Sequence, residues 1–111
     1  MNNIMNIDGH RAVVLYDPEI DMFRGEFVGL NGGADFYAND VGGLRREGSI
    51  SLRVFLDACA QAGIPSVRSF SGKFQARVPA ELHLRSSEAA AARGISLNQF
   101  VQQAIERELR A

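Results

Sequence analysis

The stretch "GKFQARVP", Gly72 to Pro79, decides how the last third of this chain folds. Its residues alternate between an apolar set and a set of long hydrogen-bond donors. The apolar set is Phe74, Ala76 and Val78, and the donor set is Lys73, Gln75 and Arg77. A period of two is typical of a β-strand with one buried and one exposed face. The sequence therefore predicts a short strand, ended by Pro79, whose exposed side carries three long donors.

Two helices are expected after this strand. The first covers "ELHLRSSEAAAAR", with Pro79 near its start and Gly94 at its end. The second begins at a capping box of Ser96 and Gln99, flanked by Ile95 and Phe100 as a hydrophobic staple. Its apolar stripe comprises Leu97, Phe100, Val101, Ala104, Ile105 and Leu109.

About 40 residues with one strand cannot bury enough apolar surface to be stable alone, so two copies are expected to associate. Pairing of the two strands would give a two-stranded ribbon that fits the DNA major groove. There Lys73 and Arg77 suit guanine, and Gln75 suits adenine. The alternative is a solvated strand face, but the two helices that follow favour DNA reading. Ser96 and Asn98, at the start of the second helix, are expected to contact a phosphate as well as to cap.

The first half of the chain predicts a hairpin, a third strand and a helix. The expected strands are residues 11–17, 22–28 and 34–38, with turns at "DPEID" and "GLNGG". Asp40 is placed as the N-cap of a helix that runs to Ala62 and stops at Gly63. Gly42, Gly43 and Gly48 weaken that helix, and its apolar stripe is Leu44, Leu52, Phe55, Leu56 and Cys59.

A Pro-, Ser- and Gly-containing connector separates two halves of different charge. Residues 1–70 hold six Lys/Arg and nine Asp/Glu, a balance of −3, whereas residues 71–111 hold six and four, a balance of +2. The connector predicts domains at residues 1–66 and 70–111 within an α+β chain.

Several classes of protein are excluded or disfavoured by composition. No apolar run in the 111 residues approaches a membrane span, and the N-terminus lacks a basic start and an apolar core of a signal peptide. Cys59 is the only cysteine, so neither an internal disulfide nor a cysteine-based metal site is available. We expect a cytoplasmic protein with no cofactor.

Residues 72–110 resemble a ribbon-helix-helix repressor domain of the Arc/MetJ type, through "KFQARVP", "AELH" and "RGISLNQFVQQAI". With "LYDPEIDMFRGEFVGLNGGADFYANDVGGLRREG" and "FSGKF", nearly the whole chain resembles the HicB antitoxin family. The resemblance implies a β-β-β-α, partial RNase H-like first domain that blocks a small mRNA-degrading HicA-type toxin. It also implies a β-α-α second domain that dimerises and represses the operon by binding operator DNA. A tetramer formed through the first domain stays open.

Two alternatives remain open. The first is a stand-alone repressor of the same fold without a toxin. The second is a metal-dependent, RNase H-like nuclease, which would need several carboxylates around two metal ions. Its candidate ligands are Asp17, Asp21, Glu26, Asp35 and Asp40. Turn and cap positions already account for three of them, and the domain is short, so we expect no enzyme. An acidic surface suits the basic RNA-binding face of a toxin better.

Overall fold

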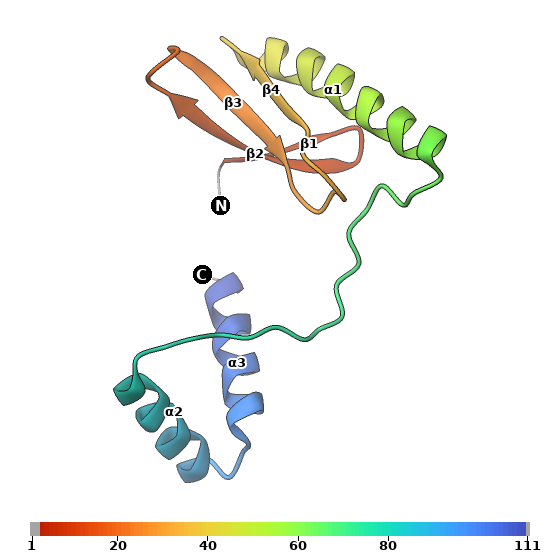
Figure 1. Cartoon of the computed structure of the whole chain (residues 1–111). Coiled ribbons are helices and arrows are strands. Elements are labelled where there is room, and N and C mark those ends of the chain that lie inside the picture. Colours follow the sequence, from red (N-terminus) through yellow and green to blue (C-terminus); the bar gives the residue numbers. More distant parts are fainter. Residues whose placement is uncertain (1–2, 111) are drawn as a thin grey trace. The chain divides into compact units, whose positions relative to one another are not determined.

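The computed structural model describes residues 3–110 and divides the chain into two compact units, residues 1–71 and 72–111. Met1, Asn2 and Ala111, which belong to the ends of the two predicted domains, lie outside the described residues. The first unit holds a sheet and one helix, and the second holds two helices (Figure 1). The chain is therefore α+β, as predicted.

The first unit contains a four-stranded antiparallel sheet in the order β1-β2-β3-β4. The strands are β1 (Ile4–Ile7), β2 (His10–Asp17), β3 (Met22–Phe27) and β4 (Asp35–Ala38). The prediction of only three strands is wrong, because it missed β1. A signal was present: Asp8 and Gly9 both have positive φ, 50° and 84°, and Asp-Gly is a strong marker of a tight hairpin turn.

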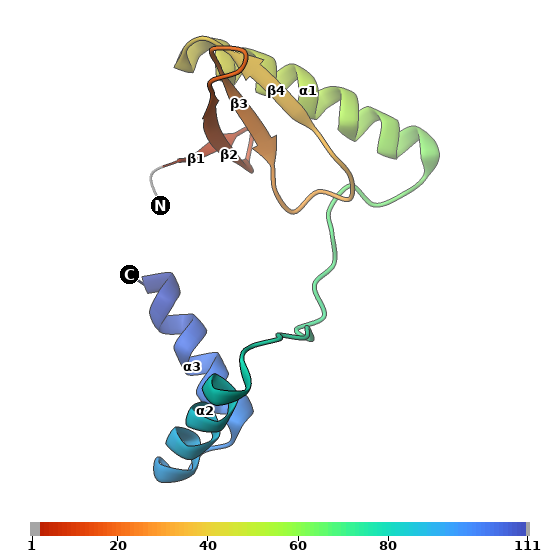
Figure 2. The same cartoon turned by 60° about the vertical axis from the view of Figure 1, so that its left-hand side comes forward.

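Helix α1 (Val41–Ala62) covers one face of this sheet (Figures 1 and 2). Both predicted ends are confirmed. The Asp40 side chain accepts a hydrogen bond from the Gly43 amide at 2.6 Å, and Gly63 adopts the left-handed conformation with φ 68°. The predicted stripe is also confirmed, since Leu44, Leu52 and Cys59 are buried while Phe55 and Leu56 pack partly buried against the core.

Glycines allow α1 to approach the sheet closely. A Cβ on Gly48 would lie 2.4 Å from Ile7 Cδ1 and 3.1 Å from the Phe36 ring. A Cβ on Gly43 would lie 2.9 Å from the Ala38 side chain. These residues weaken the helix by composition, but any larger side chain would push it off the sheet.

A short strap, residues 64–68, attaches the end of the first unit to the loop after β3. The Asn31 amide donates to the Ser66 carbonyl at 2.8 Å, and the Arg68 amide donates to the Gly29 carbonyl at 2.9 Å. Leu30 and Val67 form an isolated antiparallel bridge between these bonds. The segment that the sequence marks as a connector is thus partly a structural element of the first unit.

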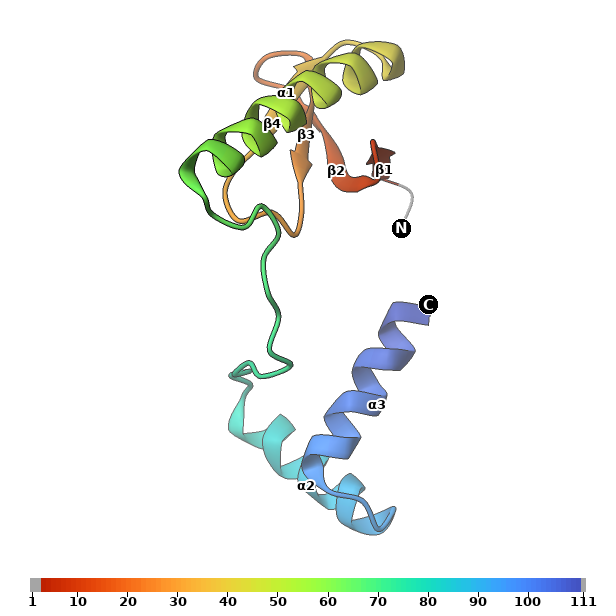
Figure 3. The ribbon, with the colours of Figure 1, turned by 90° about the vertical axis from the view of Figure 1, so that its right-hand side faces the viewer.

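The second unit is a helical hairpin of α2 (Ala80–Ala92) and α3 (Leu97–Arg110) (Figure 3). Gly94, with φ 69°, turns the chain, and the Arg93 guanidinium lies 5.2 Å from the centroid of the Phe100 ring. The strand predicted after Gly72 is not formed in the single chain, because residues 73–79 have no regular secondary structure. A strand needs a neighbour to bond with, and the pairing that we predict requires a second chain.

Candidate nucleic-acid interface

The segment before α2 presents both of its faces to solvent in the single chain. Every residue from Lys73 to Pro79 is exposed, including Phe74 at 73%. The donors Lys73, Gln75 and Arg77 therefore lie where a nucleic acid can reach them. The apolar residues that we expect on the opposite face, Phe74, Ala76 and Val78, are also exposed to solvent in the single chain.

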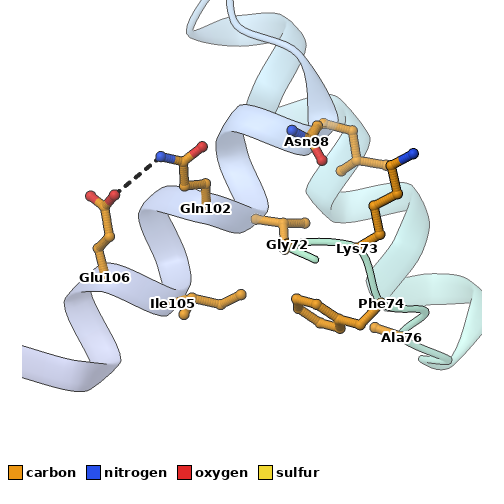
Figure 4. Close-up of a pocket in the computed structure, with 10 residues that line it drawn as sticks. Gly72, Lys73, Phe74, Ala76, Asn98, Gln102, Ile105 and Glu106 are labelled. Carbon is orange, nitrogen blue, oxygen red and sulfur yellow. Dashed lines mark hydrogen bonds between the residues drawn. The ribbon is translucent and has the colours of Figure 1, made fainter. Parts of the chain in front are cut away.

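An apolar groove lies between this segment and α3. Phe74 and Ala76 line it from the segment, and Val101 and Ile105 line it from the helix. Figure 4 shows the Phe74 ring and the Ile105 side chain pointing toward one another across the groove. Gln102 and Glu106 lie along its α3 wall, where the Gln102 amide donates to the Glu106 carboxylate at 3.2 Å. The sequence analysis missed these two polar residues, although their i, i+4 spacing beside the apolar stripe marks them.

The start of α3 is held by the predicted capping box. The Gln99 amide donates to Ser96 Oγ at 3.0 Å, and the Ser96 amide donates to Gln99 Oε1 at 2.9 Å. The Phe100 amide bonds the Ser96 carbonyl. The amides of Leu97 and Asn98 belong to the first turn and have no intrahelical acceptor, so they remain suited to an anion.

The five residues predicted to bind DNA are divided between these features. Lys73 and Asn98 line the same groove, which brings the first donor of the segment to the start of α3. Gln75 and Arg77 line a separate shallow depression with Ala76. The Ser96 hydroxyl is occupied by the capping box, so its first role is structural, whereas Asn98, two residues further on, is exposed. The contact of these residues with DNA stays a prediction.

The carboxylates of the first unit have structural partners. Asp17 accepts a hydrogen bond from the Glu19 amide at 3.0 Å, and Asp40 caps α1. Asp35 accepts a hydrogen bond from Arg24 at 2.5 Å, and Glu26 lies 4.0 Å from the same guanidinium. Among residues 3–110, no three His, Cys, Asp or Glu side chains are grouped closely enough to hold a metal ion.

Two of these carboxylates change the titration of a neighbour. Tyr16 donates to Asp21 at 2.6 Å, which raises the pKa of the phenol above its usual 10.0 because ionisation would break the bond. The hydrogen bond to Asp35 likewise raises the pKa of Arg24. Both groups belong to an exposed surface.

Comparison with known proteins gives one match. The HicB family model matches residues 55–105, from the last third of α1 through most of α3. No curated protein and no solved structure matches the chain. The match shows that this part of the chain is similar to the HicB family, in agreement with the resemblance carried by the sequence motifs. In the described part of the chain, none of the helices has the length and apolar character needed to cross a membrane.

Proposed function

We propose that this chain is the antitoxin of a HicAB-type toxin–antitoxin pair. In this proposal the first unit neutralises a small mRNA-cleaving toxin, and the second represses the operon by ribbon-helix-helix DNA binding. The observation that carries the proposal is the match of residues 55–105 to the HicB family. The match covers all of the proposed DNA-binding residues, the whole of α2 and most of α3.

The exposed apolar surface of the second unit supports a homodimer. Ala90 is the only buried hydrophobic residue that the structure describes in this unit. Phe74, Val101 and Ile105 instead line an open groove, with Val101 exposed at 39%. A second copy that filled both grooves would bury these side chains, each worth about 1.5–3 kcal/mol when fully covered.

Dimerisation would also complete the DNA-reading element. When residues 73–79 of two chains pair, the donors Lys73, Gln75 and Arg77 of each chain would double on one side of a ribbon. The ribbon would present Arg and Lys to guanine and Gln to adenine. The open amides at the start of α3 would hold flanking phosphates and fix the orientation of the ribbon.

The charge of the first unit supports a basic protein as its partner. Residues 1–70 have a balance of −3, whereas residues 71–111 have a balance of +2. An RNase that binds mRNA presents a basic surface, which an acidic domain can cover. The two units therefore have charges that suit two different partners.

The proposal expects a small basic protein, the toxin, to be encoded beside this gene, and co-expression of the two proteins tests it. The toxin alone is expected to stop growth, and co-expression of this chain is expected to restore it. In a parallel titration, the purified chain should bind the DNA upstream of its own gene more tightly than scrambled DNA. A chain that neither restores growth nor distinguishes the two duplexes would contradict the proposal.

One observation favours a second candidate, a stand-alone repressor. The family match begins at Phe55 and leaves most of the first unit unmatched. A repressor without a toxin would bind its operator but would lack a small basic protein in the neighbouring reading frame. A nuclease would be indicated only by Mg²⁺-dependent RNA cleavage by the pure protein.

A further inference from the structure

The first unit has two sides of opposite charge. Residues 1–40, which form the sheet and its turns, contain two arginines and seven carboxylates, a balance of −5. Residues 41–71, which form α1 and the strap, contain four arginines and two carboxylates, a balance of +2. Helix α1 covers one face of the sheet (Figure 2). Asp8 bonds Ser49 of α1 and Asp40 caps α1, but the other five carboxylates of residues 1–40 belong to the sheet strands and the β2–β3 turn, so most of the acidic surplus lies on the sheet side.

Among the described residues of this unit, nothing covers the face of the sheet turned away from α1, and this face carries a row of large side chains. The Phe36 ring lies over Gly25 and against Gly48 of α1, so the sequence neighbours of Gly25 and Phe36 point to the opposite face. The register places Leu15 opposite Arg24 and Arg24 opposite Tyr37. Leu15 is 61% exposed and Tyr37 is 42% exposed.

The charge at the middle of this row is already balanced. Arg24 bonds Asp35 at 2.5 Å and lies 4.0 Å from Glu26, so it adds little positive potential. Three further carboxylates, Asp17, Glu19 and Asp21, lie at the β2–β3 turn. The face therefore combines an exposed apolar row with an acidic edge, which is the composition expected of a docking surface for a basic protein.

The outer side of α1 is the competing surface, and its charge disfavours it. Ile50 and Val54 are exposed there, with Val54 at 65%. However, the arginines of residues 41–62, Arg45, Arg46 and Arg53, lie on the same helix. Glu47 and Asp57 offset two of these three charges, so a basic partner would meet a small positive balance on α1 and opposite charge on the sheet.

We propose that the open face of the sheet, centred on the row of Leu15, Arg24 and Tyr37, is the surface on which a small basic RNA-binding protein docks. This inference rests on the proposed function, since the basic protein is the toxin that the chain neutralises. The partner would cover Leu15 and Tyr37, while its basic residues would face the carboxylates of the β2–β3 turn. Association would be accelerated by the charges and slowed by salt.

The test compares three lysine substitutions in the full-length chain, titrated against the purified basic protein encoded beside its gene. Leu15→Lys and Tyr37→Lys each place an ammonium in the apolar row. Val54→Lys is the matched control, because it introduces the same residue on α1, at a side chain that is at least as exposed as Leu15 and Tyr37. All three substitutions add one positive charge. All three sites are exposed, so we expect the fold to survive, and melting curves of the variants check this.

We expect Leu15→Lys and Tyr37→Lys each to weaken binding by about tenfold or more, and Val54→Lys to change it by less than about threefold. Sedimentation of the free protein should give the same size for all variants. Unchanged binding by both row variants, or a loss confined to Val54→Lys, would overturn the surface while leaving the proposed function in place. A row variant that lowers the oligomeric state but keeps toxin binding would mean that a second copy covers this face. Failure of the unsubstituted chain to bind the basic protein would overturn the proposed function as well as the surface.

Discussion

The ring of Phe36 on β4 lies directly over Gly25 on β3. The two residues are partners in the sheet register, and a Cβ built on Gly25 would fall 2.1 Å from the ring. Gly48 of α1 approaches the same ring from the helix, where its Cβ would lie 3.1 Å away. Phe36 is thus enclosed by two glycines from different elements, and it also packs on Phe27 with 5.2 Å between ring centroids.

Gly25→Ala should therefore destabilise the first unit. The new methyl group would overlap a ring that is enclosed by its neighbours, and overpacking of this kind costs about 1–3 kcal/mol. Gly33→Ala is the control, because nothing lies within 4 Å of its Cβ position. Urea unfolding of both variants measures the difference in unfolding free energy. Equal stabilities for the two variants would mean that Phe36 moves aside freely.

The Tyr16–Asp21 hydrogen bond predicts a pH dependence at the β2–β3 turn. The phenol has a raised pKa, so the bond contributes stability fully below the unfolded pKa of about 10 and is lost as pH rises through the higher folded pKa. In a Tyr37→Phe background, which leaves one tyrosine, phenolate absorbance should rise with a midpoint above 10.

Asp21→Asn should lower that midpoint, because the amide carries no charge to oppose the phenolate. Asp21 has φ 50°, a conformation that Asn tolerates as well as Asp, so the turn should survive the change. The same midpoint in both proteins would show that the carboxylate does not control the ionisation of Tyr16.

Val101→Asp should break the proposed dimer. In the dimer this groove residue would be buried, and removing an unpaired carboxylate from water costs several kcal/mol. Gln103→Asp adds the same charge to an exposed α3 position outside the groove and should leave the dimer intact. Sedimentation equilibrium distinguishes the two. A Val101→Asp protein of unchanged oligomeric size would contradict the shared core.

Arg77→Ala should reduce sequence discrimination. If Arg77 makes a bidentate contact to guanine, its loss costs about 1–3 kcal/mol per copy on operator DNA and much less on scrambled DNA. Titrations against both duplexes at several salt concentrations measure this. Equal losses on the two duplexes would assign Arg77 to the DNA backbone, and no loss on either would leave it a solvated side chain.

Asn98→Asp should weaken binding to every sequence alike. The substitution places a carboxylate beside the amides at the start of α3, where a phosphate is proposed to sit, and it should lower the salt slope by about 1. Binding of the toxin should be unaffected, because Asn98 belongs to the second unit. A loss seen only on operator DNA would indicate that Asn98 contacts bases instead.

Local signals identified most of the elements. Caps determine where α1 and α3 begin, and both Asp40 and the Ser96–Gln99 pair make the expected bonds. Strand β1 was not predicted because its four residues lack a clear alternation, although the Asp8–Gly9 turn that follows it is a signal of a hairpin. The three glycines of α1 lower its helical propensity. Two of them, Gly43 and Gly48, are needed because they let the helix pack closely on the sheet.

The candidate sites were harder to derive, because each depends on contacts that are remote in sequence. The groove is lined by residues near 74 and residues near 101. The row on the open face can be recognised only from the strand register, which places Leu15, Arg24 and Tyr37 side by side. The alternation of a strand shows that it has two faces. It does not show which face the helix covers, because that depends on the side of the sheet on which the chain places the helix after the last strand.

The strap has a consequence for where the first unit can be cut. The Arg68 amide and the Leu30–Val67 bridge lie beyond Ser66, so a fragment that ends at residue 66 would leave the Gly29 carbonyl without its donor. A fragment that ends at Ser71 would keep the strap whole. In hydrogen exchange, the amide of Asn31 should therefore be protected in the longer fragment and exchange faster in the shorter one, because local opening is limited by the bonds that close a segment. The loop after β3 and the chain that leaves α1 would then open and close as one cooperative unit.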